Sequence, residues 1–242
     1  MQEAKKAAKI AYMTDGHGDI SAYEKLFERA EKPDVLGVLI GGDVSPRAMI
    51  KTQMDFIKGY LLPRIFEFKK KFAKETYLIL GNADYMELTK ILEDAESKGV
   101  LTLTHNSVCK LEGGYEIVGY HFLSPSKHFW FAEWERPEPQ IKHDLEKLAD
   151  HVEDMGKAIF MFHSPPLDTK LDMSLLTQHA GSFSVRGFIE HRKPLLTLHG
   201  HIHESPSISG EISEKLGSTL AVNPGSAKPI TIDLKTMEIE MI

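Results

Sequence analysis

The chain has 242 residues, with 35 Asp and Glu against 29 Lys and Arg, and its net charge of −6 argues against a broad basic surface for extended nucleic acid. The single cysteine, Cys109, excludes a disulfide within the chain, and no apolar stretch is long enough for a membrane span or a signal peptide. We therefore expect a cytoplasmic protein.

Five apolar runs along the chain each end in polar side chains that can bind metal. Residues 9–14 lead to Asp15 and His17, 35–40 to Asp43, 75–80 to Asn82, 158–162 to His163, and 195–198 to His201 and His203. Each run fits a buried β-strand, and open α/β sheets bind ligands outside the carboxyl ends of their strands. We expect these seven side chains to meet at one edge.

His201 and His203 alternate along the chain, which points both imidazoles to one side of a strand. In a chain with twelve histidines such a pair also arises by chance, so taken alone a surface position explains it about as well as a metal site. The matching residues after the other four runs favour the metal site.

Helical spacing of apolar residues follows several of these runs. We expect helices at 21–30, 48–74, 86–98, 141–155 and 182–190. Ser21 and Glu24 fit a capping box at the start of the first helix, and Pro63 predicts a kink or a division of the second.

Short β-like runs at 101–103, 107–111 and 115–119, with a Gly113-Gly114 turn, predict the start of a second sheet. Three more strands are expected at 219–223, 229–233 and 238–242. Because the site residues come from both ends of the chain, we expect a single domain over residues 1–242.

Two loops have the composition of a pocket wall. Residues 120–140 have no clear period and contain many aromatic side chains, so they form either a substrate-facing wall or a flap packed on the core. Residues 165–179 follow His163 directly and are expected at the pocket rim.

Five motifs follow one another in a fixed order: Asp15-x-His17, Gly42-Asp43, Gly81-Asn82-Ala83-Asp84, His163 and Gly200-His201-Ile202-His203. In this order the chain resembles the calcineurin-like metallophosphoesterases from Asp15 to about Ser226. The runs 200–206 and 223–226 look most like the small prokaryotic, cyclic-phosphodiesterase-related branch. The resemblance implies an α/β metallo-dependent phosphatase fold, in which two packed mixed β-sheets are flanked by helices as an α/β/β/α sandwich.

The resemblance also implies a site with two divalent metal ions roughly 3.5 to 4 Å apart. Asp43 would bridge the ions, with Asp15, His17 and His203 completing one ligand set and Asn82, His163 and His201 the other. Mixed imidazole and oxygen ligands suit Mn, Fe, Zn or Co, and Mn is favoured. In the family a metal-activated hydroxide attacks phosphorus, so Asp43, Asn82, His163 and His201 are the expected catalytic residues.

The main departure from the family pattern is Ala83. Most members have a histidine there that protonates the leaving oxygen, and Asp84 commonly orients that histidine. His121 and His128 are the best substitutes in the sequence, although a structural role is favoured for each. His199 is expected to be structural, and residues 223–226 to form a tight turn without chemistry.

The sequence therefore predicts a dinuclear metal-dependent phosphoesterase, acting on a small phosphodiester in preference to a phosphomonoester. A small phosphate ester is the expected partner, with no membrane and no extended nucleic acid, and a homo-oligomer is left open. The alternative is a catalytically weak, metal-binding interaction scaffold of the same fold. The complete set of seven ligand residues favours the enzyme.

Overall fold

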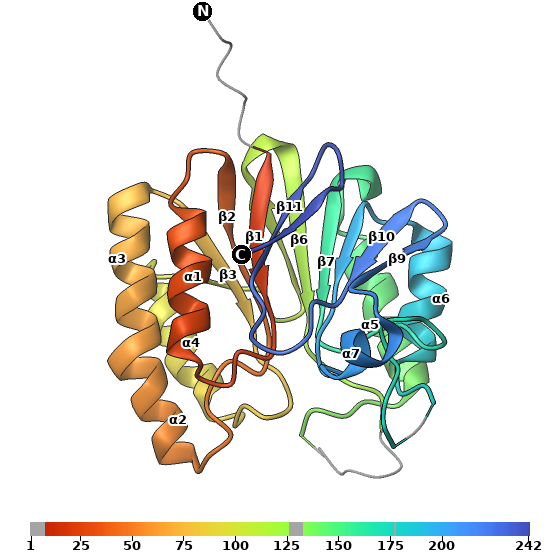
Figure 1. Ribbon diagram of the computed structural model, residues 1–242, viewed down its shortest axis with the longest axis horizontal. Coiled ribbons are helices and arrows are strands. Elements are labelled where there is room, and N and C mark those ends of the chain that lie inside the picture. The colour runs from red at the N-terminus through yellow and green to blue at the C-terminus, as the bar shows by residue number, and fades with distance from the viewer. Residues whose placement is uncertain (1–7, 126–132, 177) are drawn as a thin grey trace, which may run out of the picture.

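Two six-stranded mixed β-sheets pack face to face in the computed structural model, which describes residues 8–125, 133–176 and 178–242 (Figure 1). The first sheet has the order β12 (Ile239–Met241), β11 (Ile230–Asp233), β1 (Lys9–Met13), β2 (Val35–Gly41), β3 (Glu75–Ile79) and β4 (Thr102–Leu103). The second has the order β5 (Ser107–Leu111), β6 (Tyr115–Tyr120), β7 (Ala158–Phe162), β8 (Leu196–Leu198), β10 (Thr219–Val222) and β9 (Ser213–Leu216).

The central strands of each sheet are parallel. Strands β1 to β4 run parallel in the first sheet, and β6, β7, β8 and β10 do so in the second, while β11, β12, β5 and β9 pair antiparallel at the margins. Parallel strands deliver their carboxyl ends to one edge. Each of the five strands predicted to carry site residues is therefore central, with its polar loop at that edge.

One predicted strand belongs to a different sheet from the one expected. Residues 101–103 were expected to begin the second sheet, but Thr102 pairs parallel with Tyr77 at the margin of the first. The connection through α4 (Leu88–Ser97) returns the chain beside β3, since strands that follow one another along a chain tend to be neighbours in space. The second sheet begins only with β5.

Helices cover the outer faces of both sheets (Figure 1). The first sheet is covered by α1 (Ile20–Ala30), α2 (Ile50–Phe56), a π-helical turn (Ile57–Leu61), α3 (Leu62–Phe72) and α4. The second is covered by α5 (Glu138–Ala149) and α6 (Phe183–Arg192), and a short α7 (Ser205–Ser209) follows β8. Single 3₁₀ turns span Glu112–Gly114 and Met155–Lys157. The predicted α/β/β/α sandwich is confirmed.

The termini of two helices show how the sequence patterns are used. Pro63 lies just after the π-helical turn, and the chain stays helical from Ile50 to Phe72, so the long helix is not divided there. The irregularity at Pro63 takes the form of this π-helical turn, which interrupts the α-helical hydrogen-bond pattern just before the residue that lacks an N–H. The predicted cap of α1 is wrong. Asp19, not Ser21, precedes the helix and accepts from the Ala22 N–H at 3.1 Å, which leaves Ser21 inside the first turn.

The apolar strands are buried on both faces. In β1, Ala11 and Met13 face the helices, while Ile10 and Tyr12 pack into the layer between the two sheets. This explains why the central strands are continuously apolar rather than alternating. The carboxyl ends of these strands are accordingly fixed in place.

The aromatic segment packs on the core where the structure describes it. Trp134 is 4% exposed and belongs to the core cluster under the first sheet, and the guanidinium of Arg136 lies 3.9 Å from the centre of the Phe122 ring. The packing interpretation therefore holds for Trp134. His128, Phe129, Trp130 and Phe131 lie outside the described residues.

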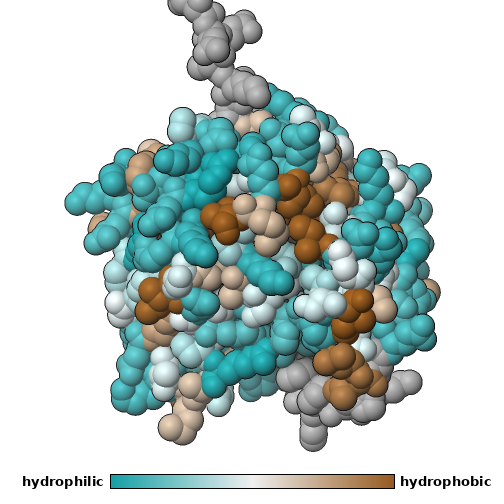
Figure 2. All heavy atoms as spheres, in the orientation of Figure 1, coloured by the Kyte–Doolittle hydropathy of each residue, from teal (hydrophilic) through white to brown (hydrophobic). Residues whose placement is uncertain are grey.

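The surface in Figure 2 is mostly hydrophilic, with hydrophobic residues in small separate groups. Within the described parts of the chain, no helix is both long and apolar enough to cross a membrane.

Candidate metal centre

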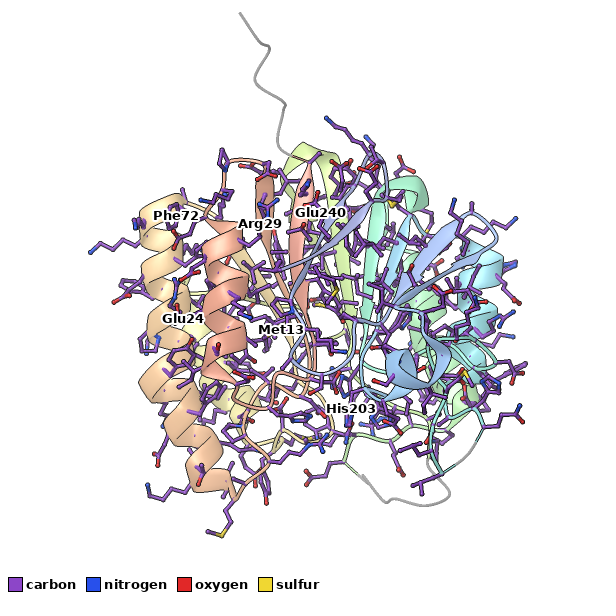
Figure 3. All side chains as sticks on the ribbon, viewed as in Figure 1. Met13, Glu24, Arg29, Phe72, His203 and Glu240 are labelled. Atoms are coloured by element: carbon purple, nitrogen blue, oxygen red, sulfur yellow. The ribbon has the colours of Figure 1, made fainter. Side chains whose placement is uncertain are left out.

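The seven predicted side chains come from loops at the carboxyl edge of both sheets. Asp15 and His17 follow β1, Asp43 follows β2, Asn82 follows β3, His163 follows β7, and His201 and His203 follow β8. Figure 3 shows His203 in the lower half of the molecule, between the loops of the two sheets.

Asp43 lies at the centre of this group. Its Oδ1 is 3.4 Å from Nε2 of His163, and its Oδ2 is 3.7 Å from Nε2 of His17. Burial disfavours the charge on Asp43, but the imidazole of His163 outweighs burial and holds the pKa of this carboxyl well below its usual range. Each oxygen of the ionised Asp43 carboxylate thus faces a different group of potential metal ligands.

His163, Asn82 and His201 converge on one side of Asp43. Oδ1 of Asn82 is 3.1 Å from Nε2 of His163 and 2.7 Å from Nδ1 of His201. Nδ1 of His163 donates to the carbonyl of Gly41 at 2.9 Å, which fixes the ring and aims Nε2 at the centre of the site. Burial lowers the pKa of His163, but Asp43 outweighs it and raises the value to about 9.

Asp15 is fully buried beside this group. It accepts from Oγ1 of Thr14 at 2.9 Å and from the backbone N–H of His201 at 3.1 Å. Burial raises the pKa of Asp15 to about 6, although the charge of His163 opposes the shift.

His17 and His203 lie on the other side of Asp43, and both contact Arg47. One guanidinium nitrogen of Arg47, Nη2, is 2.8 Å from Nε2 of each imidazole. Burial lowers the pKa of His17 to about 4, so its ring is neutral and Nε2 accepts. Nε2 of His17 and Nε2 of His203 can therefore contact the same cation.

Sequence reasoning did not single out Arg47. Its position four residues after Asp43, on the same loop, was the available signal.

Four of the seven residues have backbone conformations that non-glycine residues rarely adopt. The φ angles are 51° for Asp15, 43° for His17, 50° for Asp43 and 64° for His201. Strain of this kind gathers at functional sites, where the surrounding structure compensates for it.

Close packing explains the glycine before Asn82. A Cβ on Gly81 would lie 2.6 Å from Nε2 of His163, so only glycine fits there.

Asp84 has a role that does not require a neighbouring histidine. Its buried carboxylate accepts from the backbone N–H groups of Val44 and Ser45 and of Gly81, at 2.9 to 3.1 Å, and from the Ser45 hydroxyl. It therefore joins the loop that carries Asp43 to the loop that carries Asn82.

The imidazole of His121 is packed rather than presented to the site. Its ring centre lies 4.2 Å from that of His105 and 5.3 Å from that of Trp134. Burial lowers the pKa of His121 well below its ordinary value, so at neutral pH the ring is not the imidazolium that would act as a general acid. The structural role favoured from the sequence agrees with this geometry.

His199 is also engaged within the protein. It is fully buried, with Nδ1 donating to the Ser164 carbonyl at 3.0 Å and Nε2 lying 2.8 Å from Oγ1 of Thr197. Both ring nitrogens are used, as expected for a structural histidine.

Two further segments fix the position of the last histidines. The amide of Asn223 donates to the carbonyl of Ile202 at 3.2 Å, and the hydroxyl of Ser226 donates to the Asp15 carbonyl at 2.8 Å. The loop after His163 lies alongside α7, because the Met173 N–H donates to the Ser205 hydroxyl at 2.9 Å. The turn predicted to have no chemistry thus supports the site.

A surface hollow lined by Glu24, Arg64 and Phe72 lies on the helical side, well away from His203 (Figure 3). Arg64 already pairs with Glu24 at 2.9 Å across it. We assign it no function.

The donor atoms fit a site for divalent metal. The ligand atoms of Asp15, Asp43 and His163 all lie within 4.8 Å of one another, and the three side chains are buried. Carboxylate and imidazole together suit first-row divalent ions.

Comparison with known proteins agrees with this chemistry. A family model described as calcineurin-like phosphoesterase matches residues 8–205, whereas the search of curated proteins found no match. The structure of TT1561 from Thermus thermophilus has a TM-score of 0.71 at 20% identity and covers 98% of both chains. A dimetal phosphatase from Danio rerio has a TM-score of 0.61 at 9% identity, covering 98% of this chain and 96% of the other. The protein belongs to the calcineurin-like phosphoesterase family.

Proposed function

We propose that this protein is a dinuclear metal-dependent phosphoesterase that hydrolyses a small phosphodiester. The proposal depends on one observation, which is that the two carboxylate oxygens of Asp43 face different imidazoles. Its Oδ1 faces His163 at 3.4 Å, and its Oδ2 faces His17 at 3.7 Å. A carboxylate placed in this way is suited to bridge two cations.

The two donor sets would be those expected from the family pattern. Asp15, His17 and His203 would hold one ion with Asp43, and Asn82, His163 and His201 would hold the other. Bound divalent ions would polarise a phosphoryl oxygen and lower the pKa of water in the site. The dimetal character of the zebrafish relative supports this interpretation, and Mn is our favoured metal.

Besides the two metal ions, Arg47 would contribute positive charge to the site. Its guanidinium lies between His17 and His203, at the outer side of the site. Arginine is suited to hold two phosphate oxygens at once because its N–H donors form a rigid fork. We assign Arg47 to the non-bridging oxygens of the substrate.

The loops around the site favour an ester with an apolar part. Met49, Tyr85 and Leu175 follow three of the ligand loops and are 75%, 42% and 81% exposed. If these side chains border the substrate, they would suit an apolar or aromatic ester group, and for this reason we favour a diester. A cytoplasmic location is a separate proposal, which follows from the single cysteine.

Hydrolysis of an activated aryl phosphodiester tests the proposal directly. The metal-free protein should be inactive and should gain activity with Mn or another first-row ion. A protein that binds metal but hydrolyses neither mono- nor diesters across a panel of metals would instead be the scaffold alternative.

A further inference from the structure

Gln53 is a buried polar side chain that the metal centre itself does not account for. It lies on α2 and is 1% exposed. Its amide nitrogen donates to the carbonyl of Pro46 at 2.9 Å and to the carbonyl of Ala83 at 2.7 Å, and its amide oxygen accepts from the Tyr85 N–H at 2.9 Å. The amide therefore uses both its donors and its acceptor.

These three bonds connect two loops that are far apart in sequence. Pro46 lies between Asp43 and Arg47 on the loop after β2, and Ala83 and Tyr85 flank Asp84 on the loop after β3. Ala83 immediately follows Asn82, so its carbonyl is close along the chain to a predicted ligand. Gln53 thus holds the backbone on which Asn82 and Arg47 are placed.

The carboxylate of Asp84 joins the same two loops from the interior, through the N–H groups of Val44, Ser45 and Gly81. Gln53 joins them from α2, at different peptide groups. Because each loop carries ligands of the centre, a shift between the loops would change the separation of Asp43 and Asn82.

We propose that Gln53 is a positioning residue of the metal centre, which fixes the loop of Asn82 relative to the loop of Asp43 and Arg47. This rests on the proposed function. The side chain touches no predicted ligand atom and acts through the peptide groups that it binds.

An amide is the group that this position requires. The two carbonyls need N–H donors, and the Tyr85 N–H needs an acceptor, which no apolar side chain or carboxylate provides together. Leaving such groups without partners in a buried position destabilises that arrangement of the loops. The loops would be expected to move to regain hydrogen bonds.

The test uses Gln53→Met, which removes all three bonds at similar volume, and Gln53→Glu, which keeps an acceptor for Tyr85 and loses the amide donors. Gln140→Glu is the matched control, since Gln140 is exposed and, among the contacts described, its side-chain amide bonds only Asp144 of its own helix. The melting temperature of each protein is measured first, and all readouts are taken well below the lowest of these values. The readouts are Mn²⁺ affinity by calorimetry, kcat/KM for an aryl phosphodiester, and hydrogen exchange at the amides of Ala83 and Tyr85.

Both Gln53 variants should lose roughly 10- to 100-fold in Mn²⁺ affinity and in kcat/KM, the range for removing groups that orient metal ligands. Exchange at Ala83 should accelerate in both variants, and exchange at Tyr85 should accelerate in Gln53→Met. Gln140→Glu should match the wild type.

A lower melting temperature with unchanged Mn²⁺ affinity, kinetics and Ala83 exchange would overturn the positioning role, because it would show a purely structural residue. Wild-type protein that neither binds Mn²⁺ nor hydrolyses the diester would overturn the proposed function instead. The exchange rates at Ala83 would still decide whether Gln53 fixes the loop.

Discussion

The backbone N–H of Ala83 donates to Oδ1 of Asp43 at 2.7 Å. The residue that lacks the family's imidazole therefore still contributes to the site through its main chain. Its side chain is a methyl group, which can neither bind phosphate nor supply a proton. The chemistry most affected is protonation of the leaving oxygen.

The missing imidazole predicts a steep dependence of kcat/KM on leaving-group pKa. A general acid typically accelerates the reaction by about 10²- to 10⁴-fold for poor leaving groups, and it accelerates it little for activated aryl groups. Ala83→His should therefore help alkyl esters more than aryl esters. We expect a gain of no more than about 10²-fold, the lower end of that range, because the Asp84 carboxylate is already engaged by Val44, Ser45 and Gly81.

The measurement is kcat/KM over a series of leaving groups for both proteins. A shallow dependence in the wild type would show that another group already supplies the proton.

Asp43→Asn should abolish most of the activity. The substitution keeps the shape of the side chain and removes its charge. Because the metal ions would then stabilise the transition state less, by several kcal/mol, kcat should fall by roughly 10²- to 10⁴-fold. His191→Asn is the control, because His191 lies in the last turn of α6, exposed and away from the site. Metal content and kcat of both variants are measured together. Asp43→Asn with normal metal content and turnover would remove Asp43 from its bridging role.

Arg47 should affect substrate binding more than metal content. Hydrogen bonds to charged groups contribute about 1.5–3 kcal/mol, so Arg47→Met should raise KM by roughly 10- to 100-fold. Arg47→Lys should give an intermediate KM, because lysine keeps the charge and loses the fork. Steady-state kinetics at saturating metal check this. An unchanged KM in Arg47→Met would place the phosphate elsewhere.

The position of each site residue in the fold explains whether it could be predicted from the sequence. The seven strand-end residues could be found because parallel buried strands end at a common edge, and that edge collects whatever polar residues follow. Arg47 was missed because it lies in an irregular loop, where no periodicity fixes the direction of a side chain. Gln53 was not singled out because it lies within a predicted helix. Its partners are backbone groups, one about 30 residues away and one on a nearby loop, and the sequence pattern does not show them.

Capping shows a similar limit of local reasoning. Asp19 and Ser21 are both good cap residues, and Ser21 has the additional Glu24 signature. The choice depends on the turn before the helix, where Gly18 has a φ of 77° and the Asp19 N–H donates to the Gly16 carbonyl at 2.8 Å. Such geometry comes from the loop of the metal centre and is not contained in the helix sequence.

His105 predicts a loss of stability in acid for the metal-free protein. Its Nε2 accepts from the Leu80 N–H at 2.9 Å, and burial lowers the pKa of His105 from 6.5 to about 4. The unfolded chain therefore binds the proton first. Its contribution to stability is complete above pH 6.5 and is lost as the pH falls toward 4, by about 3 kcal/mol at pH 4.

His105→Gln can keep an acceptor for Leu80 without titrating. Denaturant unfolding with chelator present should show a smaller fall in stability between pH 6.5 and 4 for this variant than for the wild type. Equal slopes for the two proteins would show that folding does not lower the pKa of His105.

The central claim is that two divalent ions held around Asp43 make this protein a phosphoesterase. The most direct test is to add Mn²⁺ stepwise to metal-free protein and to follow hydrolysis of an activated aryl phosphodiester against bound metal per chain. Our account predicts that activity is absent without metal and reaches its plateau at two bound ions. A plateau at one bound ion, or two bound ions without hydrolysis, would contradict it.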